Sequence, residues 1–230
     1  MTGQVIAIDG PSGAGKSTLA KGLARHLNLA YLDTGAMYRA AALWVADNGA
    51  LDNPAQMAGL VQAMELVMAL DPAAATVSLA GVDVSQAIRT PQVSAMVSQV
   101  STQVPVRRVL IGRQRAIIAA ELTPQGWAEG RGIVVEGRDI TTVVAPDADT
   151  RLLITASPEV RLARRGAQLA DEGMAQPAAA TGDQVLRRDR DDSSVASFQV
   201  PAPGVCLIDT THLEPAQTLV QALVVVKGNR

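Results

Sequence analysis

The sequence predicts an α/β fold built on a five-stranded parallel sheet with helices on both faces. Short apolar runs alternate along the chain with longer segments of helical pattern, which is typical of strand–helix–strand units. The apolar runs lack the alternation of polar residues seen in half-exposed strands, so the strands should be buried on both faces. A chain of 230 residues, 48% of them hydrophobic, suffices for one such domain with insertions.

Five segments have the pattern of buried strands. They are Val5–Ile8, Ala30–Leu32, Ile133–Val135, Leu152–Thr155 and Val205–Ile208. The expected helices between them are Lys16–Leu27, Gly35–Asn48, Ala55–Ala69, Gln92–Gln103, Val106–Glu121, Pro158–Asp171, Asp183–Asp191 and Pro215–Val226.

Two stretches interrupt this alternation. Alternating residues on both sides of Ala80-Gly81 predict a small hairpin over Thr76–Val84. The segment Gly173–Gly182 is rich in Ala, Gly and Pro and precedes a charged run over Arg187–Asp192, which indicates a hinge followed by a lid.

The composition excludes several classes of protein. A net charge of −2 and an aromatic content of 2% argue against nucleic acid as a partner. A single cysteine can form neither an internal disulfide nor a cysteine-based zinc site. We find no signal peptide and no apolar segment of membrane-spanning length, so we expect a cytoplasmic protein without a membrane partner.

A phosphate-binding loop follows the first predicted strand and opens the first helix. The residues match G-x-x-x-x-G-K-[ST] and, with the next residue, are expected to bind a nucleotide: Gly10, Pro11, Ser12, Gly13, Ala14, Gly15, Lys16, Ser17 and Thr18. Small residues let the backbone N–H groups turn inward around phosphate, and Lys16 adds a cation. Ser17 is the expected Mg²⁺ ligand. The alternative is a plain glycine turn between strand and helix.

The nucleotide could serve several kinds of protein. No base-reading N-K-x-D string of the usual GTPase kind occurs, and Ile133–Glu136 continues into Gly137-Arg138-Asp139 rather than ending in an acidic pair. The charges of this segment follow a strand, where open α/β sheets bind ligands. A small-molecule kinase is therefore favoured, with a binding protein that has lost phosphoryl transfer as a rival from another class.

With these motifs, the segments 32–39 and Glu136-Gly137-Arg138-Asp139 make the chain resemble the bacterial cytidylate kinases. The match extends in order over nearly the whole chain, through Ser98-Gln99-Val100, Arg107, Arg113-Gln114-Arg115, Arg188-Asp189 and Asp192-Ser193. The resemblance implies a three-layer P-loop fold with an inserted monophosphate-binding subdomain that carries a small sheet, and a short helical lid. We expect the core at 1–33, 105–172 and 204–230, the insertion at about 34–104 and the lid at about 173–203. The whole would act as one kinase domain and a monomer.

The resemblance also implies the reaction and its residues. ATP, with Mg²⁺, would phosphorylate CMP and dCMP. Lys16, Arg188 and Asp192 are the expected catalytic residues. The expected substrate-binding residues are Thr34, Tyr38, Arg39, Ser98, Arg107, Gln114, Arg138, Asp139 and Asp192.

Two positions depart from the family pattern. Val195 stands where a lid arginine is expected, and Thr141 stands where glycine is usual. Val195 motivates the alternative of a nucleotide-binding protein that has lost phosphoryl transfer, and a kinase for another small acceptor also stays open as an alternative.

Several of these charged residues could also have a purely structural or solvent-exposed role. Residues 34–39 could belong to a plain amphipathic helix with an exposed arginine, and Arg113–Arg115 to a solvated cationic face. Arg161 and Arg165 could meet ATP or solvent, and Asp9 and Asp33 could cap helices or lie near the chemistry. Of these two carboxylates, Asp33 is the one that we expect nearer Mg²⁺ or the acceptor.

Overall fold

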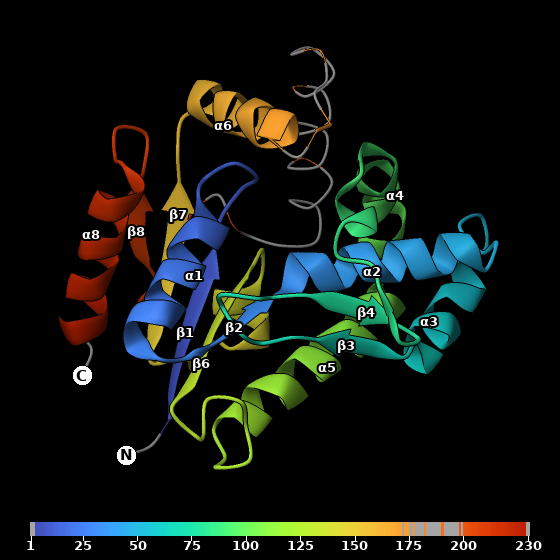
Figure 1. Cartoon of the computed structure of the whole chain (residues 1–230), viewed down its shortest axis with the longest axis horizontal. Helices are drawn as coiled ribbons and strands as arrows, with labels where there is room; N and C mark the ends of the chain where they lie inside the picture. Colours follow the sequence, from blue (N-terminus) through green and yellow to red (C-terminus); the bar gives the residue numbers. More distant parts are fainter. Residues whose placement is uncertain are drawn as a thin grey trace.

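Five parallel strands form the central sheet of the computed structural model, in the order β2-β6-β1-β7-β8 (Figure 1). The structure describes residues 3–171, 173, 174, 177, 182, 190, 198 and 200–228. The strands are β1 (Gln4–Asp9), β2 (Ala30–Asp33), β6 (Gly132–Gly137), β7 (Thr150–Thr155) and β8 (Cys206–Asp209). All four pairings are parallel, so the predicted α/β class and its five strands are confirmed.

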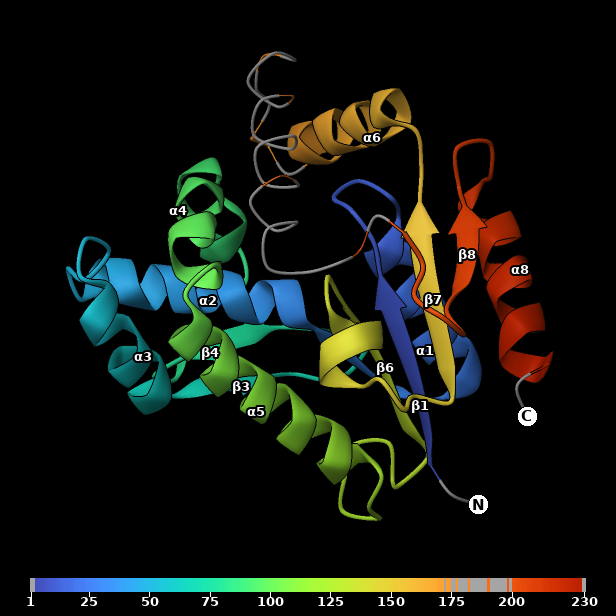
Figure 2. The ribbon, with the colours of Figure 1, turned by 180° about the vertical axis from the view of Figure 1, so that it is seen from behind.

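Helices cover both faces of this sheet. On one face, α1 (Lys16–Leu27) and α8 (Pro215–Gly228) pack through Leu19, Leu23 and Ala222 against strand side chains such as Ile6 and Ile154. On the other face lie α5 (Val104–Glu121) and the short π-helix η2 (Ile140–Val144), on the side of the molecule seen in Figure 2. They bury a second set of aliphatic residues against the sheet. The three layers follow from strands that are apolar on both faces.

A second, smaller unit follows the second strand. It contains α2 (Thr34–Asp47), α3 (Pro54–Ala63), η1 (Ala87–Arg89), α4 (Pro91–Ser101) and an antiparallel sheet of β3 (Leu66–Met68), β4 (Val77–Leu79) and β5 (Val82–Asp83). The hairpin of β4 and β5 confirms the hairpin expected over 76–84. These elements and the first half of α5 share a hydrophobic core of their own.

The expected helix Ala55–Ala69 is wrong beyond Ala63. The chain leaves the helix at Met64, and Leu66–Met68 pair with β4 instead. An apolar run of this length fits a helix or a strand equally well. The antiparallel partner, nine to thirteen residues away in the sequence, decides between them.

A further helix, α6 (Pro158–Asp171), follows β7. The 3₁₀ turn η1 and the π-helix η2 were not predicted. The expected helix Asp183–Asp191 lies outside the described residues except for Arg190. Within the described ranges, no helix combines the length and apolar character needed to cross a bilayer.

Candidate active site

A cavity of about 740 Å³ opens at the carboxyl ends of the central strands, where ligands bind in open α/β sheets. One end is lined by the phosphate loop and the start of α1, together with residues of α6 and of the segment after β8. The other end is lined by Arg39, Ile88, Val97, Ser101 and Arg107 from the smaller unit and the start of α5. Between the two ends lie residues 136–139 at the end of β6.

The phosphate loop needs glycine where it touches the rest of the chain. A Cβ on Gly10 would lie 2.1 Å from the Ile154 carbonyl oxygen, and one on Gly13 would lie 2.5 Å from that of Arg161. Both glycines also have positive φ, at 151° and 78°. The loop is therefore held between β7 and α6 by close backbone packing, with the N-terminus of α1 facing the cavity.

Lys16 lies over this loop. Its Nζ donates to the Pro11 carbonyl at 2.9 Å, and its side chain lines the cavity with those of Ser17 and Thr18. Residues 12–18 all line the cavity, whereas Gly10 and Pro11 do not. The structure thus brings most of the predicted nucleotide-binding residues together at one end of the cavity.

A buried cluster of acids and hydroxyls lies beside Lys16. Glu136 is 3% exposed and accepts a hydrogen bond from the Tyr31 hydroxyl, and Ser17 also hydrogen-bonds to its carboxyl group. Burial and then the nearby Asp33 carboxylate raise the pKa of Glu136 to about 7, against the lowering effect of Lys16. Burial likewise raises the pKa of Tyr31 above its ordinary value.

Sequence reasoning did not single out Glu136 or Tyr31 as site residues. In the sequence, Glu136 belongs to the motif that continues to Asp139. In the structure its strand, β6, lies beside β1, and Glu136 is the partner of Asp33 in the pairing of β6 with β2. A carboxylate at the end of a strand beside the phosphate loop was the signal that could have found it. Asp33 both caps α2, by accepting from the Ala36 N–H at 2.9 Å, and lines the cavity.

The first turns of α2 face the end of the cavity away from the phosphate loop. The Thr34 hydroxyl donates to the Glu136 carbonyl at 2.8 Å, and Arg39 donates to Ser94 Oγ at 2.6 Å and to the Ile88 carbonyl at 3.1 Å. Thr34, Tyr38 and Arg39 all line the cavity. The alternative of an ordinary helix with an exposed arginine is therefore wrong, because Arg39 is partly buried between α2, η1 and α4.

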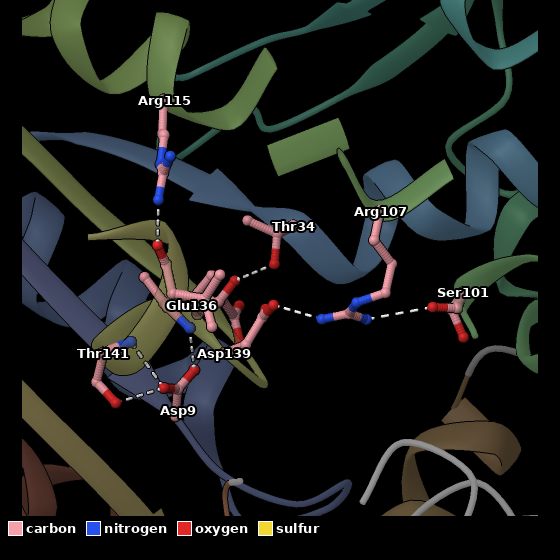
Figure 3. A network of polar contacts seen from close by, with 10 residues as sticks. Asp9, Thr34, Ser101, Arg107, Arg115, Glu136, Asp139 and Thr141 are labelled. Carbon is pink, nitrogen blue, oxygen red and sulfur yellow. Dashed lines mark hydrogen bonds and ion pairs between the residues drawn. The ribbon is translucent and has the colours of Figure 1, made fainter. Parts of the chain in front are cut away.

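Arg107 and Asp139 form an ion pair in the wall of the cavity. One Nη of Arg107 lies 2.5 Å from Asp139 Oδ2, and the other donates to the Ser101 carbonyl at 3.2 Å (Figure 3). The Arg107 guanidinium also lies 5.7 Å from the centre of the Tyr38 ring. Arg138, next to Asp139, lies 4.4 Å from the centre of the Phe198 ring, and Phe198 is 1% exposed.

Two predicted substrate-binding residues, Ser98 and Gln114, are not among the residues that line this cavity. Ser98 lies one turn before Ser101 on α4, and Ser101 lines the cavity in its place. Gln114 is fully buried in α5, and the described residues offer its amide no hydrogen-bond partner. Substrate contact by Ser98 and Gln114 stays a prediction.

Arg113 and Arg115 both bind backbone carbonyls, Arg113 from a partly buried position and Arg115 from an exposed one. Arg113 donates to the Gln62 and Met64 carbonyls at 2.8 Å each, and so binds the C-terminal end of α3. Arg115 donates to the Val143 and Val144 carbonyls, at 2.6 and 3.1 Å, at the end of η2. Helix ends carry unsatisfied carbonyls, which explains the pairing of both arginines.

The arginines of α6 differ from one another. Arg161 is 8% exposed and donates to the Ser12 carbonyl at 3.1 Å, so the expectation of a solvated side chain is wrong for this residue. Arg164 donates to the Thr210 hydroxyl and carbonyl, both at 2.9 Å. Arg164 and Arg165 line the same end of the cavity as the phosphate loop.

The expected lid residues Arg188 and Asp192, and the departure Val195, lie outside the described residues. Their roles stay predictions. The other departure, Thr141, is buried, and its hydroxyl donates to Asp9 Oδ2 at 2.6 Å. Asp9 also accepts from the backbone N–H groups of Ile140 and Thr141, so it caps η2.

Comparison with known proteins agrees with this geometry. The family model described as cytidylate kinase matches residues 6–227. A protein named cytidylate kinase from Cutibacterium acnes is 47% identical over 218 residues, covering 94% of this chain and 92% of that protein. A protein of the same name from Streptomyces griseus is 42% identical, covering 98% of this chain and 94% of that protein. Another from Nocardia farcinica is 44% identical, covering 91% of this chain and 87% of that protein. With a match over nearly its entire length and relatives well above 30% identity, the chain belongs to the cytidylate kinase family.

Proposed function

We propose that the chain transfers the terminal phosphoryl group of ATP to CMP and dCMP, which gives CDP and dCDP. The observation that carries this proposal is one continuous cavity with a phosphate loop at one end and Arg39 and Arg107 at the other. Two phosphate-binding ends in one cavity suit a donor and an acceptor nucleotide held for direct transfer. The names of the relatives select cytidine monophosphates as the acceptors.

The donor end would hold the ATP phosphates. Residues 12–18 line it, and the N-terminus of α1 adds its dipole to their backbone N–H groups. The Lys16 ammonium would neutralise charge on the β and γ phosphates as it develops during transfer. Arg161 stabilises the phosphate loop through its hydrogen bond to the Ser12 carbonyl.

The residues near Lys16 fit a magnesium ion. Mg²⁺ prefers oxygen ligands and is commonly held by one or two protein groups together with substrate phosphates and water. Ser17 offers a hydroxyl and Asp33 a carboxylate at the same end of the cavity. Among the described residues no three His, Cys, Asp or Glu side chains form a metal cage, which suits an ion shared with the substrate. When bound, Mg²⁺ would screen the charge of the ATP phosphates.

The acceptor end would hold the monophosphate. Arg39 and Arg107 present guanidinium groups that suit its phosphate oxygens, while Thr34, Tyr38, Arg138 and Asp139 line the neighbouring wall. A nucleoside monophosphate already carries an anionic oxygen at neutral pH, so the reaction needs no general base. Ser98, Gln114, Asp192 and Arg188 would complete the site, Arg188 arriving from the lid to neutralise the transition state and exclude water.

The proposed division of the chain places the core at 1–33, 105–172 and 204–230, the insertion at 34–104 and the lid at 173–203. The separate small sheet and hydrophobic core of the inserted unit support this division. We also propose a cytoplasmic monomer that acts on small molecules and not on nucleic acid. The net charge of −2 and the small number of aromatic residues support this choice of partner.

The test is ADP production from ATP and Mg²⁺ with CMP, dCMP, UMP, AMP or GMP as acceptor. We expect selective turnover with CMP and dCMP. Lys16→Met should reduce the rate by about 100-fold or more, since a single electrostatic group at the transition state is commonly worth that much. Lys227→Met, on the exposed end of α8, is the matched control and should leave the rate unchanged.

Other outcomes would redirect the proposal. Selective turnover with AMP, GMP or UMP would assign the chain a different acceptor. ATP binding without turnover of any acceptor would instead support a nucleotide-binding protein that has lost phosphoryl transfer.

A further inference from the structure

Asp9 connects the phosphate loop to the loop that carries Asp139. It is the last residue of β1, directly before Gly10, and its side chain is 1% exposed. Its carboxylate accepts from the Ile140 N–H and the Thr141 N–H at 2.8 Å each, and from the Thr141 hydroxyl at 2.6 Å (Figure 3). These partners lie more than 130 residues away in the sequence.

The two residues held by Asp9 follow directly after Asp139. Asp139 in turn pairs with Arg107 at 2.5 Å, and Arg107 binds the Ser101 carbonyl. Two sets of polar contacts, joined by the peptide bond between Asp139 and Ile140, therefore connect the start of the phosphate loop with the acceptor end of the cavity (Figure 3). Asp9 itself does not line that cavity, so its carboxylate is outside the surface that would meet either nucleotide.

The buried carboxylate needs these donors. Burial raises the pKa of Asp9, and the bonds from Thr141 and Ile140 act against that rise, as does the Lys16 cation. A buried charge is tolerated when several donors surround it, and those donors then fix its position closely. Two of the donors are backbone groups that cap η2. The third is the Thr141 hydroxyl, a side-chain donor that glycine or valine at this position could not supply.

We propose that Asp9 and Thr141 are positioning residues that fix Asp139, and through it Arg107, relative to the phosphate loop. This inference rests on the proposed function, since Arg107 is placed there to bind the acceptor phosphate. The hydrogen bond from the Thr141 hydroxyl to Asp9 fixes the acceptor end of the cavity relative to the donor end. A guanidinium held in place loses less freedom when it binds the acceptor phosphate, so losing this hydrogen bond should weaken the binding of CMP.

The test compares Thr141→Val with Thr141→Ser. Valine keeps the branched shape but removes the hydroxyl, and serine keeps the hydroxyl but removes the methyl group. For Thr141→Val we expect the KM for CMP to rise roughly five- to tenfold, with the KM for ATP within about twofold. This rise is smaller than that for losing a direct hydrogen bond to the substrate, because Thr141 acts only through Asp9, Asp139 and Arg107. Thr141→Ser should keep both constants within about twofold of the parent protein. Equal changes in both KM values, or none in that for CMP, would overturn the proposal.

A second readout does not depend on the reaction. The side-chain N–H signals of Arg107 in NMR should exchange slowly in the parent chain and in Thr141→Ser, because Asp139 holds the guanidinium, and faster in Thr141→Val. Unchanged exchange in Thr141→Val, with the thermal unfolding midpoint measured in parallel, would show that Thr141 only stabilises the fold.

The two readouts separate the failure of this inference from that of the proposed function. Absence of CMP turnover by the parent chain overturns the proposed function, whereas the Arg107 exchange decides the positioning role in either case. Asp9→Asn is a stronger test of the same bond, because its amide would place donors against the N–H groups of η2. If that variant does not fold, the two Thr141 variants still decide.

Discussion

Arg107 and Asp139 bind each other, at 2.5 Å between a guanidinium nitrogen and Oδ2, although the sequence assigned each of them to the substrate. Their side chains are 13% and 4% exposed, so the pair is largely removed from water. The carboxylate thereby orients the guanidinium in the cavity before any nucleotide binds. A pre-oriented arginine loses less freedom on binding phosphate than a solvated one.

The first prediction concerns Arg107. Arg107→Ala should raise the KM for CMP by about 10- to 100-fold, since one hydrogen-bonded charge contact is commonly worth about 1.5–3 kcal/mol. The KM for ATP should change little, because Arg107 lies at the other end of the cavity. Steady-state kinetics with each substrate varied in turn measures both constants. Arg108→Ala removes an exposed arginine one residue further on and should leave both constants unchanged.

The second prediction separates a structural arginine from a binding one. Arg113 donates to two carbonyls at the end of α3, so Arg113→Ala should lower the free energy of unfolding by about 1 kcal/mol, with the partial exposure of the side chain limiting the effect. Urea unfolding measures this change. The KM for CMP should stay within about twofold, and a tenfold rise would instead place Arg113 in the substrate site.

The third prediction follows from Glu136. Its pKa is about 7 in the folded chain, above the ordinary value of 4.5, so the folded state binds this proton more tightly than the unfolded state. The stabilisation from the protonated carboxyl is complete below about pH 4.5 and is lost as the pH rises to about 7. Glu136→Gln removes that loss, so the variant should gain stability relative to the parent chain between pH 5 and 8.

Thermal or urea unfolding of both proteins across this pH range measures the difference. Burial also raises the pKa of Asp9, but this group is common to both proteins and cancels in the comparison. A difference in stability that does not vary with pH would mean that Glu136 stays ionised in the folded chain.

The fourth prediction concerns the single phenylalanine. The Phe198 ring lies 4.4 Å from the Arg138 guanidinium and is buried, so the two side chains hold each other by a cation–π contact. Phe198→Leu should raise the KM for CMP by about two- to tenfold, since such a contact is worth about 0.5–2 kcal/mol when shielded from water. Phe198→Tyr keeps an aromatic face and should stay close to the parent value. Equal effects of leucine and tyrosine would show that the packing of Phe198 matters and its aromatic face does not.

Local patterns were sufficient for much of the fold and for the donor end of the cavity. The strands that became β1, β2, β6, β7 and β8 were predicted from short apolar runs, and the phosphate loop from a motif in the expected strand–helix context. The acceptor end was predicted only in part. Thr34, Arg39 and Arg107 do line the cavity, but Ser98 and Gln114 do not, and Glu136 was not singled out.

By itself, the sequence determined the class of sheet, the position of the phosphate loop and the membership of a kinase family. The sheet and the phosphate loop depend on neighbours within one turn or one strand, whose spacing is visible in the chain. The family follows instead from the resemblance of motifs spread over nearly the whole chain. Only the tertiary structure decided that Leu66–Met68 form a strand, that Arg113 and Arg115 bind helix ends, and that Asp9 holds Thr141. Each of these outcomes depends on a partner from another part of the chain, about ten residues away for the strand and 132 for Asp9 and Thr141. A buried polar group is hydrogen-bonded to a partner that the fold brings next to it, and the local spacing of residues does not reveal which partner that is.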